Sequence, residues 1–532
     1  MTRLLFFGAL LCLSGSLAKP SSRSDSVVFC YYEEWSNERP SVGRFGVSDL
    51  PTDLCTHIAY SFITLDGPTG NLTIPEDTSY EGKSSVASPN TGDSDVKNFN
   101  SLKQIDPDLK ILISVGGWTE GSTNFSAVVN DDALRANFVK NLYEYIDTKG
   151  FDGCDVDWEY PTQRGGLETD KEKFISLMKE LKEAFTPKGY LLTAAVAVTQ
   201  DDIDLSYDVV ALNKYLDYIN LMTYDLHGNW DTVTGANAPL YPQLTDGPDV
   251  NMNVNNSVHV WVENGASPSK LLLGLGNYGN TFTLTSLNNT STGAPFDGAG
   301  EAGPYTSEAG TLAYYEICED QKNNPSEWNI TEVKGSYVYA NKGLLWVGYD
   351  NANTIYAKGR FAKQMGLAGI MYWSPDLDDF YGLCGDKFPL TIAGVKGFKG
   401  CMFTEFRTDG FHAIMRKRAA SLMRRVRASP NSLLRVVASR LDCPFQHHWM
   451  KLLVRLQQFK ANDNFFGGVN ILLFGDLMQL PPVPKSAGGA YCFKQPQMLE
   501  SEVVNDDALR ANFVINLYEY INTKGFDGCD VD

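Results

Sequence analysis

The sequence predicts an α/β fold, most simply a closed (β/α)8 barrel, and three observations support it. Short apolar runs rich in branched residues alternate with helical patterns up to about residue 390, which favours a parallel sheet. There are eight such runs, the number of strands in this barrel. The chain of 532 residues is also long enough, since such a barrel takes ~250 residues or more. A doubly wound open sheet is the alternative.

The eight expected strands are short and apolar, as strands covered on both faces of a parallel sheet are. In chain order they are Val27–Tyr32, His57–Phe62, Lys110–Val115, Phe151–Asp157, Tyr190–Val198, Asp217–Met222, Lys270–Leu275 and Leu367–Trp373.

The clearest helical pattern runs over Asp131–Thr148, where apolar residues recur every four positions and form one face. Asn130 is the expected N-cap, and Gly150 is the expected end of this helix. Further helices are expected over Thr169–Phe185, Asp204–Tyr215 and Asn351–Met365.

The stretch 277–345 is rich in Gly, Thr, Tyr and Asn and is too long for a loop. We therefore expect a small inserted α+β domain ahead of the last strand.

Residues 1–18 have the pattern of a secretory signal peptide. Arg3 precedes the apolar run Leu4–Leu13, and cleavage is expected after Ala18; a buried first strand or helix is the alternative. No later run approaches the ~20 apolar residues of a membrane span. We therefore expect a secreted, extracellular protein with no membrane partner. Disulfides are then permitted, and six sequons become possible glycan sites: Asn71, Asn124, Asn255, Asn288, Asn289 and Asn329.

The fourth expected strand carries the sharpest chemical signal, FDGCDVDWEYP from Phe151 to Pro161. Side chains alternate along a strand, so Asp155, Asp157 and Glu159 point the same way. In a barrel they face the interior and approach the C-terminal rim, where active sites of this fold lie. Three confined carboxyl groups do not all ionise near neutral pH, and a carboxyl that keeps its proton can act as a general acid. An exposed acidic edge strand and a Ca²⁺ site are the alternatives.

This segment resembles the active-site signature of glycoside hydrolase family 18, the chitinases and chitinase-like lectins. The family pattern DxxDxDxE is intact, beginning at Asp152 and ending at Glu159. The similarity spans roughly residues 25–395 through further blocks in order. These are Cys30–Trp35, Cys55–Phe62, Ser114–Trp118, Met222–Asp225, Leu312–Glu316, Trp346–Asp350 and Met371–Trp373.

The resemblance implies an enzyme that hydrolyses β-1,4-linked N-acetylglucosamine in chitin or chitooligosaccharides, without metal or cofactor. Glu159 would be the general acid, Asp157 would orient the substrate acetamido group, and Asp155 would share a proton with Asp157. Tyr224 and Asp225 would hydrogen-bond the same sugar. The implied substrate-binding residues are Tyr31, Phe62, Gly117, Trp118, Met222, Asp225, Tyr278 and Trp373.

The resemblance also implies disulfides Cys30–Cys55 and Cys318–Cys384, with Cys154 as a buried thiol. Two departures from the family pattern affect the cleft: Asn280 stands where Arg is usual, and Ser374-Pro375 replaces a commoner small pair. A lectin-like chitin-binding protein is the alternative function, but lectins of this kind lack the acid that Glu159 supplies.

The last 131 residues differ in charge. The whole chain has 45 Lys and Arg against 64 Asp and Glu, a net charge of −19, yet residues 402–532 alone carry 16 against 13. Residues 402–502 include a basic stretch and FFGGVNILLFGDLMQLPPV from Phe465 to Val483, which resembles a motif of Pif1-like helicases, including those of transposons. The chain has no GxxxxGK[ST] phosphate loop, so we expect no helicase activity, and nucleic acid is an improbable partner of this acidic chain.

Residues 503–532 repeat residues 128–157 with two differences, Ile515 for Lys140 and Asn522 for Asp147. The copy stops two residues before the equivalent of Glu159. It therefore lacks the acid and a barrel to join. We expect this C-terminal extension to be poorly ordered, and the protein to be a monomer. A helicase-related, nucleic-acid-binding chimera is the second alternative function.

Overall fold

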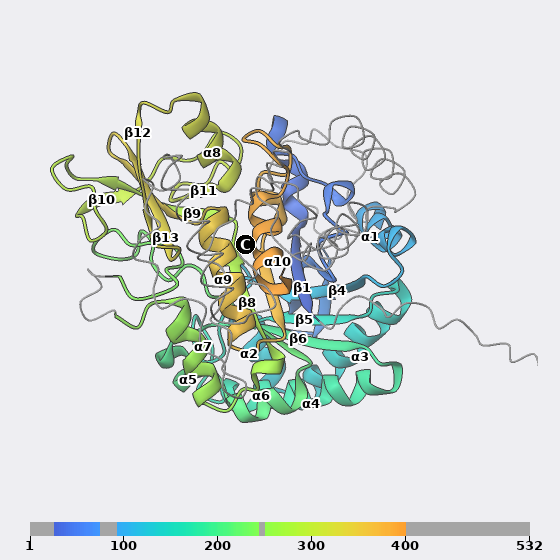
Figure 1. Cartoon of the computed structure of the whole chain (residues 1–532). Helices are drawn as coiled ribbons and strands as arrows, with labels where there is room; N and C mark the ends of the chain where they lie inside the picture. Colours follow the sequence, from blue (N-terminus) through green and yellow to red (C-terminus); the bar gives the residue numbers. More distant parts are fainter. Residues whose placement is uncertain (1–25, 75–92, 244–249, 401–532) are drawn as a thin grey trace, which may run out of the picture. The chain divides into compact units, whose positions relative to one another are not determined.

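The computed structural model describes residues 26–74, 93–243 and 250–400 (Figure 1). In this part of the chain, eight parallel strands close into a barrel. Strand β1 (Val27–Glu33) pairs in parallel with β15 (Gly369–Trp373) on one side and with β2 (His57–Asp66) on the other. This second pairing closes the sheet. The predicted (β/α)8 barrel is therefore confirmed, and the open doubly wound sheet is excluded.

The other barrel strands follow one another around the ring in chain order, and each overlaps the run predicted for it. They are β4 (Lys110–Gly116), β5 (Gly153–Asp157), β6 (Leu191–Val196), β7 (Tyr218–Leu221) and β8 (Leu271–Gly276). A short strand, β3 (Asn71–Thr73), extends β2 as an antiparallel hairpin.

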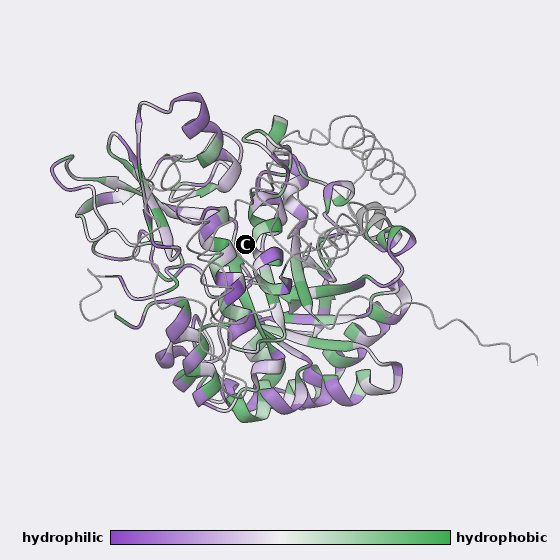
Figure 2. Cartoon of the chain, in the orientation of Figure 1, coloured by the Kyte–Doolittle hydropathy of each residue, from purple (hydrophilic) through white to green (hydrophobic). Residues whose placement is uncertain are grey.

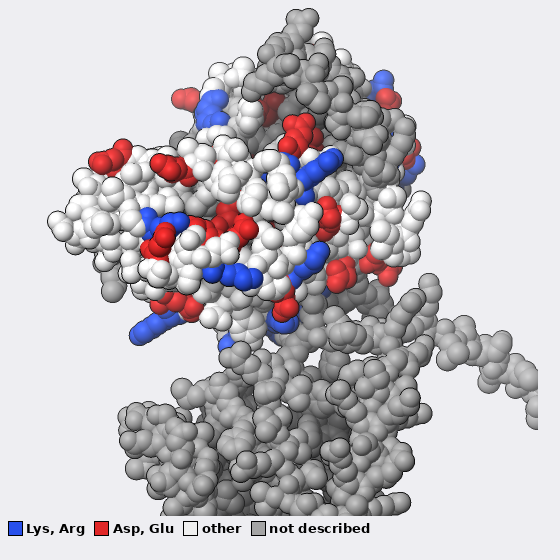
Figure 3. Space-filling view, turned by 90° about the horizontal axis from the view of Figure 1, so that it is seen from above, with Lys and Arg blue, Asp and Glu red and all other residues white. Residues whose placement is uncertain are grey.

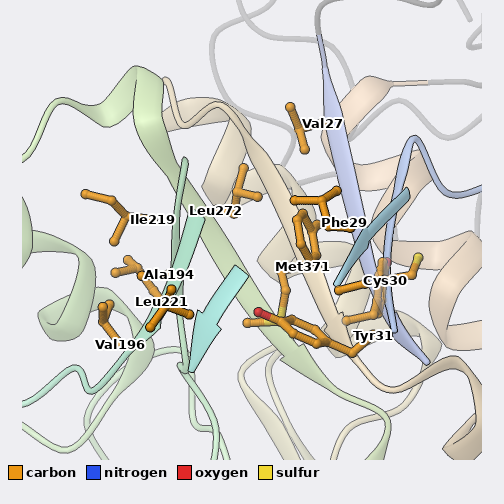
Figure 4. Close-up of a cluster of buried hydrophobic side chains, with 14 of the residues drawn as sticks. Val27, Phe29, Cys30, Tyr31, Ala194, Val196, Ile219, Leu221, Leu272 and Met371 are labelled. Atoms are coloured by element: carbon orange, nitrogen blue, oxygen red, sulfur yellow. The ribbon is translucent and has the colours of Figure 1, made fainter. Parts of the chain in front are cut away.

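Apolar side chains from these strands form the main core. Figure 4 shows side chains of β1, β6, β7, β8 and β15 gathered in the barrel, with Tyr31 and Met371 pointing toward one another. Phe29, Ile219 and Leu272 are fully buried. Burial of this apolar area is the main favourable contribution to the free energy of folding. The acidic groups of the site lie beyond this core, toward the C-terminal ends of the strands.

Helices surround the barrel strands (Figure 1). In chain order the helices of the described residues are α1 (Asp93–Ile105), α2 (Thr123–Asn130), α3 (Asp132–Lys149), α4 (Asp170–Phe185), α5 (Gln200–Ser206), α6 (Val209–Tyr215), α7 (Val254–Glu263), α8 (Tyr314–Asn323), α9 (Ala352–Gln364) and α10 (Pro389–Lys399).

The predicted start of α3 was wrong by one residue. Asp131, not Asn130, is the N-cap, because its carboxylate accepts hydrogen bonds from the backbone N–H groups of Ala133 and Leu134. Asn130 ends α2 and donates to Asp170 instead. Gly150 ends α3 in the left-handed conformation at φ 79°, as predicted.

The single helix predicted over Asp204–Tyr215 is two helices. Tyr207 is extended, at φ −128° and ψ 133°, and Asp208 caps a new helix by accepting from the N–H of Ala211. An aspartate competes well for such a cap, and the apolar pattern did not reveal the break.

The insertion leaves the barrel after β8 and forms an antiparallel sheet to one side of it (Figure 1). Its strands are β9 (Tyr278–Leu284), β10 (Phe296–Ala299), β11 (Thr311–Ala313), β12 (Trp328–Val333), β13 (Tyr337–Lys342) and β14 (Leu345–Tyr349). The order is β10-β9-β14-β13-β12, with β11 on β9. Together with α8, this sheet is the expected α+β insertion.

Two disulfides form as the family resemblance implies, Cys30–Cys55 and Cys318–Cys384, and Cys154 is a buried free thiol. No helix of the described ranges has both the length and the apolar character needed to cross a bilayer. The expected signal peptide, the helicase-like region and the repeat at 503–532 lie outside the described residues.

A buried ion pair joins the end of the insertion to the barrel helices. Lys358 on α9 donates to Asp350, which follows β14, and their side chains are 1% and 3% exposed. Removing one partner would leave a buried charge without compensation.

We therefore predict that Lys358→Met destabilises the protein by about 3–5 kcal/mol, measured by denaturant unfolding. The double variant Lys358→Met/Asp350→Leu removes both charges and should recover most of that loss. Equal losses in the single and double variants would contradict this account.

Candidate active site

The acidic residues of β5 lie at the C-terminal end of the barrel, and all three are buried. Asp155 is 0%, Asp157 4% and Glu159 8% exposed. Asp155 and Asp157 belong to the strand, whereas Glu159 follows its end. The sequence-predicted alternation thus places three carboxyl groups together, in the order from the barrel interior toward the rim.

Four side chains from neighbouring strands hold Asp155 in the interior. Its Oδ2 accepts from the Tyr31 hydroxyl at 2.8 Å and from Ser114 Oγ at 2.9 Å. Its Oδ1 accepts from Thr193 Oγ1 at 2.6 Å and from Asn220 Nδ2 at 3.1 Å. Burial raises the pKa of Asp155, and these hydrogen bonds lower it in part. Asp155 is therefore fixed in position with its lone pairs satisfied.

Asp157 is less satisfied than Asp155. Its buried Oδ1 has no hydrogen-bond partner in the described part of the protein. Burial raises the pKa of Asp157 well above its usual range, and the charges of Glu159 and Asp155 raise it further. No hydrogen bond joins Asp155 and Asp157 in this site, so their shared proton stays a prediction.

Glu159 has a pKa raised to about 7. Burial is the main cause, and repulsion from Asp225 adds to it, while a hydrogen bond with Tyr160 and the charge of Arg164 act in the opposite direction. A carboxyl group with this pKa is partly protonated at neutral pH, so it can deliver a proton to a leaving oxygen.

A second polar group surrounds the carboxyl of Asp225. The Tyr278 hydroxyl donates to Asp225 Oδ2 at 2.7 Å, and Asn280 Nδ2 donates to Asp225 Oδ1 at 2.9 Å. The side chain of Asn237 accepts from the Asp225 backbone N–H at 2.7 Å. The insertion strand β9 therefore contributes directly to the site through Tyr278 and Asn280.

Four aromatic rings are packed beside the acids. The ring centroids of Phe62 and Trp373 are 5.8 Å apart, those of Tyr31 and Trp373 5.4 Å, and those of Trp35 and Phe62 6.1 Å. Trp35 is 39% exposed. Sugar rings stack well on such partly exposed aromatic faces, so this cluster suits a saccharide.

The remaining predicted residues occupy different depths. Tyr224 is buried, with its hydroxyl 3.8 Å from the sulfur of Met371, and Met222 is half-buried. Trp118 is 61% exposed, and the guanidinium of Arg164 stacks over its ring, with Cζ 3.5 Å from the ring centroid. Trp118 thus lies at the exposed rim, not in the closely packed floor.

Gly117 has a steric role. Its φ is +89°, a Cβ there would lie 2.7 Å from the Phe62 ring, and its N–H donates to the Asp157 carbonyl at 2.8 Å. A side chain would therefore displace Phe62. No contact of Gly117 itself points to a direct part in binding.

Several residues of the site were not in the predicted set. Ser114, Thr193 and Asn220 hold Asp155, and Arg164 donates to the Glu159 carbonyl at 2.9 Å. The first three are polar residues inside apolar strands, and that signal could have revealed them. Trp35 belongs to the family-like block Cys30–Trp35, but it was not among the predicted site residues.

Seen from above, the molecule carries acidic and basic side chains intermixed, with a group of acidic side chains near the middle of this face (Figure 3). Among the described residues, one cluster has ligand atoms close enough for a metal, Cys318, Asp379 and Cys384. Its two cysteines are joined as a disulfide, so it offers no free thiolate ligand.

Known proteins resemble this chain over the barrel and its insertion. It is 38% identical to an endochitinase of Manduca sexta over 379 residues, covering 69% of this chain and 67% of that protein. It is 39% identical to human chitinase-3-like protein 2, covering 68% and 90%.

Two solved structures are similar as well. The Group IV chitinase of Ostrinia furnacalis, solved in complex with allosamidin, has a TM-score of 0.65 and 40% identity, covering 69% of this chain and 97% of that one. Human YKL-39, described as a pseudo-chitinase that retains chitooligosaccharide binding, has a TM-score of 0.63 and 35% identity, covering 70% and 100%.

Relatives described as chitinases and one described as a pseudo-chitinase are thus both similar to this chain in fold and sequence. Overall similarity therefore does not distinguish an active enzyme from a binding protein, and the acidic residues of β5 and Glu159 are the relevant evidence. Residues 27–378 match the sequence model of glycosyl hydrolases family 18. This match covers more than half of the chain and includes every residue of the site described above, so the chain belongs to glycosyl hydrolases family 18.

Proposed function

We propose that this protein is a catalytically competent chitinase that cleaves β-1,4 linkages of N-acetylglucosamine polymers with retention of configuration. The observation that carries the proposal is Glu159, a buried carboxyl with a pKa raised to about 7 at the C-terminal end of the barrel. Chitooligosaccharide binding by relatives supports the choice of substrate.

The first step needs an acid at the glycosidic oxygen. Glu159 gives its proton to that oxygen, the bond to the anomeric carbon breaks, and the leaving sugar departs as an alcohol. The raised pKa matters because an ordinary glutamate would be ionised and could not donate near neutral pH.

The second requirement is a nucleophile. In the substrate-assisted route, the acetamido oxygen of the substrate attacks the anomeric carbon and forms an oxazolinium ion, which water then opens, so no enzyme carboxylate is needed for this step. Asp157 has an unpartnered Oδ1 that can accept from the acetamido N–H. It also supplies negative charge beside the developing cation.

Tyr224, Tyr31 and the aromatic floor complete the site. The Tyr31 hydroxyl already donates a hydrogen bond to Asp155. The role of Tyr31 is therefore to hold Asp155 in position and to form part of the aromatic floor of the site. Tyr224 has its hydroxyl against a weak acceptor, the Met371 sulfur, which leaves it able to bond the sugar instead. Trp373, Phe62 and Trp35 provide the stacking faces.

We propose that the protein is secreted, because residues 1–18 fit a signal peptide and the barrel holds two disulfides. Glycans on the exposed Asn71, Asn288, Asn289 and Asn329 fit this compartment.

Intact mass of the secreted protein after deglycosylation tests this proposal. We expect a product that begins at Lys19 and carries both disulfides. A product that retains residues 1–18, or protein found inside the cell alone, would contradict secretion. The same mass shows whether the product extends beyond residue 400.

We predict that Glu159→Gln lowers kcat on a fluorogenic chitooligosaccharide by about 10²–10⁴-fold, the usual contribution of a general acid. Binding of an unlabelled chitooligosaccharide, measured by calorimetry, should persist, because Gln preserves the shape of the side chain. Equal kcat values for the wild type and the variant would contradict the role of Glu159 as the general acid. Equal inactivity of both would favour the lectin alternative.

We also predict a pH-dependent difference in stability between the wild type and Glu159→Gln. The folded pKa of Glu159 lies near 7 against a usual value of 4.5, so the folded state keeps a proton that the unfolded state loses. Wild-type stability is therefore lost as pH rises from about 4.5 to 7, by up to about 3 kcal/mol.

The variant has no carboxyl to ionise at this position and should escape that loss. Denaturant unfolding should show similar stabilities at pH 4 and a more stable variant at pH 8. A wild type that gains stability relative to the variant between pH 4.5 and 7 would contradict the raised pKa.

A further inference from the structure

Arg164 contacts two parts of the site at once. It lies in the loop between β5 and α4, and its Nη1 donates to the Glu159 carbonyl at 2.9 Å. The same guanidinium stacks over the ring of Trp118, which is 61% exposed and belongs to the neighbouring loop after β4. A single side chain therefore joins the backbone of the acid to the aromatic ring at the rim.

The loop that holds Arg164 is anchored where α4 begins. Asp170 is fully buried there, and its carboxylate accepts from the Leu167 N–H at 2.8 Å. It also accepts from Ser126 Oγ at 2.8 Å and from Asn130 Nδ2 at 2.7 Å, and both of these side chains belong to α2. The end of the loop is thus tied to α2 as well as to α4.

The beginning of the same loop is joined to the loop after β4. Ser122, which is 1% exposed, accepts from Trp158 Nε1 at 2.9 Å and donates to the Tyr160 carbonyl at 2.8 Å. The two loops are also in close contact, because a Cβ on Gly165 would lie 2.9 Å from Thr123 Oγ1. Their positions are therefore fixed by contacts other than the stack of guanidinium on indole.

Titratable groups face Glu159 from several elements. They are Asp157 on β5, Tyr160 and Arg164 on its own loop, Tyr207 between α5 and α6, and Tyr224 and Asp225 after β7. Burial raises the pKa of Glu159 most, and repulsion from Asp225 adds to this effect. The hydrogen bond with Tyr160 and the positive charge of Arg164 lower the same pKa. Arg164 therefore makes Glu159 a stronger acid than it would be without this charge.

We propose that Arg164 is a positioning residue of the reaction, whose planar guanidinium holds the Trp118 ring in place for the substrate and whose donor group holds the carbonyl of Glu159. This inference rests on the proposed chitinase activity. It has two separable consequences. The stack acts on substrates long enough to reach the rim, whereas the charge acts on the proton of Glu159 with substrates of any length.

The first consequence is measured as a chain-length preference, the kcat/KM on chitopentaose divided by that on chitotriose. The test uses the full-length protein at pH 5, where Glu159 keeps its proton. Arg164→Lys retains the charge but loses the flat group that stacks on the indole. It should lower the preference about two- to fivefold, the contribution of an exposed cation–π contact.

A double-mutant cycle tests whether this loss passes through the stack. Trp118→Ala should also lower the chain-length preference. In the Trp118→Ala background, Arg164→Lys should then cause no further loss, because residues that act through one contact are not additive.

The second consequence is measured as the basic limb of the pH profile of kcat/KM on chitotriose, which reports the pKa of the acid in the free enzyme. Arg164→Gln removes the charge that lowers this pKa, so the limb should move to higher pH. The activity kept at pH 8 relative to pH 5 should rise by up to about fivefold, the upper range for an exposed charge pair. Arg164→Lys should leave the limb in place.

Lys140→Gln is the matched control, since it removes an exposed positive charge on α3. It should leave the chain-length preference and the basic limb unchanged. Arg164 is itself exposed, so its variants remove no buried group.

An Arg164→Lys variant that keeps the chain-length preference of the wild type would overturn the proposal, and so would a loss of the same size in the Trp118→Ala background. A basic limb that stays in place or moves to lower pH in Arg164→Gln would overturn the part assigned to the charge. A wild type that cleaves neither chitopentaose nor chitotriose would overturn the proposed chitinase activity instead, so the failures are distinguishable.

Discussion

The site depends on keeping three carboxyl groups away from water at the end of one barrel strand. Burial alone would make each of them costly to ionise. The barrel treats them differently: Asp155 receives four hydrogen bonds, Asp157 keeps an unpartnered oxygen, and Glu159 lies nearest the rim with a pKa of about 7. Its four hydrogen bonds fix Asp155 in position, whereas burial keeps Glu159 able to act as a proton donor.

Much of the fold could be predicted because the relevant signals are local. Strand alternation correctly placed Asp155, Asp157 and Glu159 together, and the eight apolar runs correspond to the eight barrel strands. The two disulfides followed from the family resemblance, not from spacing. The break at Tyr207 was missed and the start of α3 was predicted one residue too early, because the side chains of Asp208 and Asp131, rather than the apolar pattern, decide where those helices begin.

The rest of the site depends on contacts between distant segments. The donors to Asp155 come from β1, β4, β6 and β7, and no local pattern indicates that four polar residues on four strands meet one carboxylate. Asn280 was recognised as a departure from the family pattern, but its consequence was not visible in the sequence. The structure shows that its amide bonds to Asp225 and to the His227 carbonyl, which fixes the orientation of Asp225.

The central claim is that burial, not a special partner, turns Glu159 into an acid that is still protonated near neutral pH. A carbon-13 NMR titration of the Glu159 side-chain carboxyl in the free enzyme, assigned by comparison with Glu159→Gln, measures this directly. The account predicts a midpoint near pH 7. A midpoint at or below the usual value of 4.5 would contradict it, because Glu159 would then be ionised where the enzyme is proposed to work.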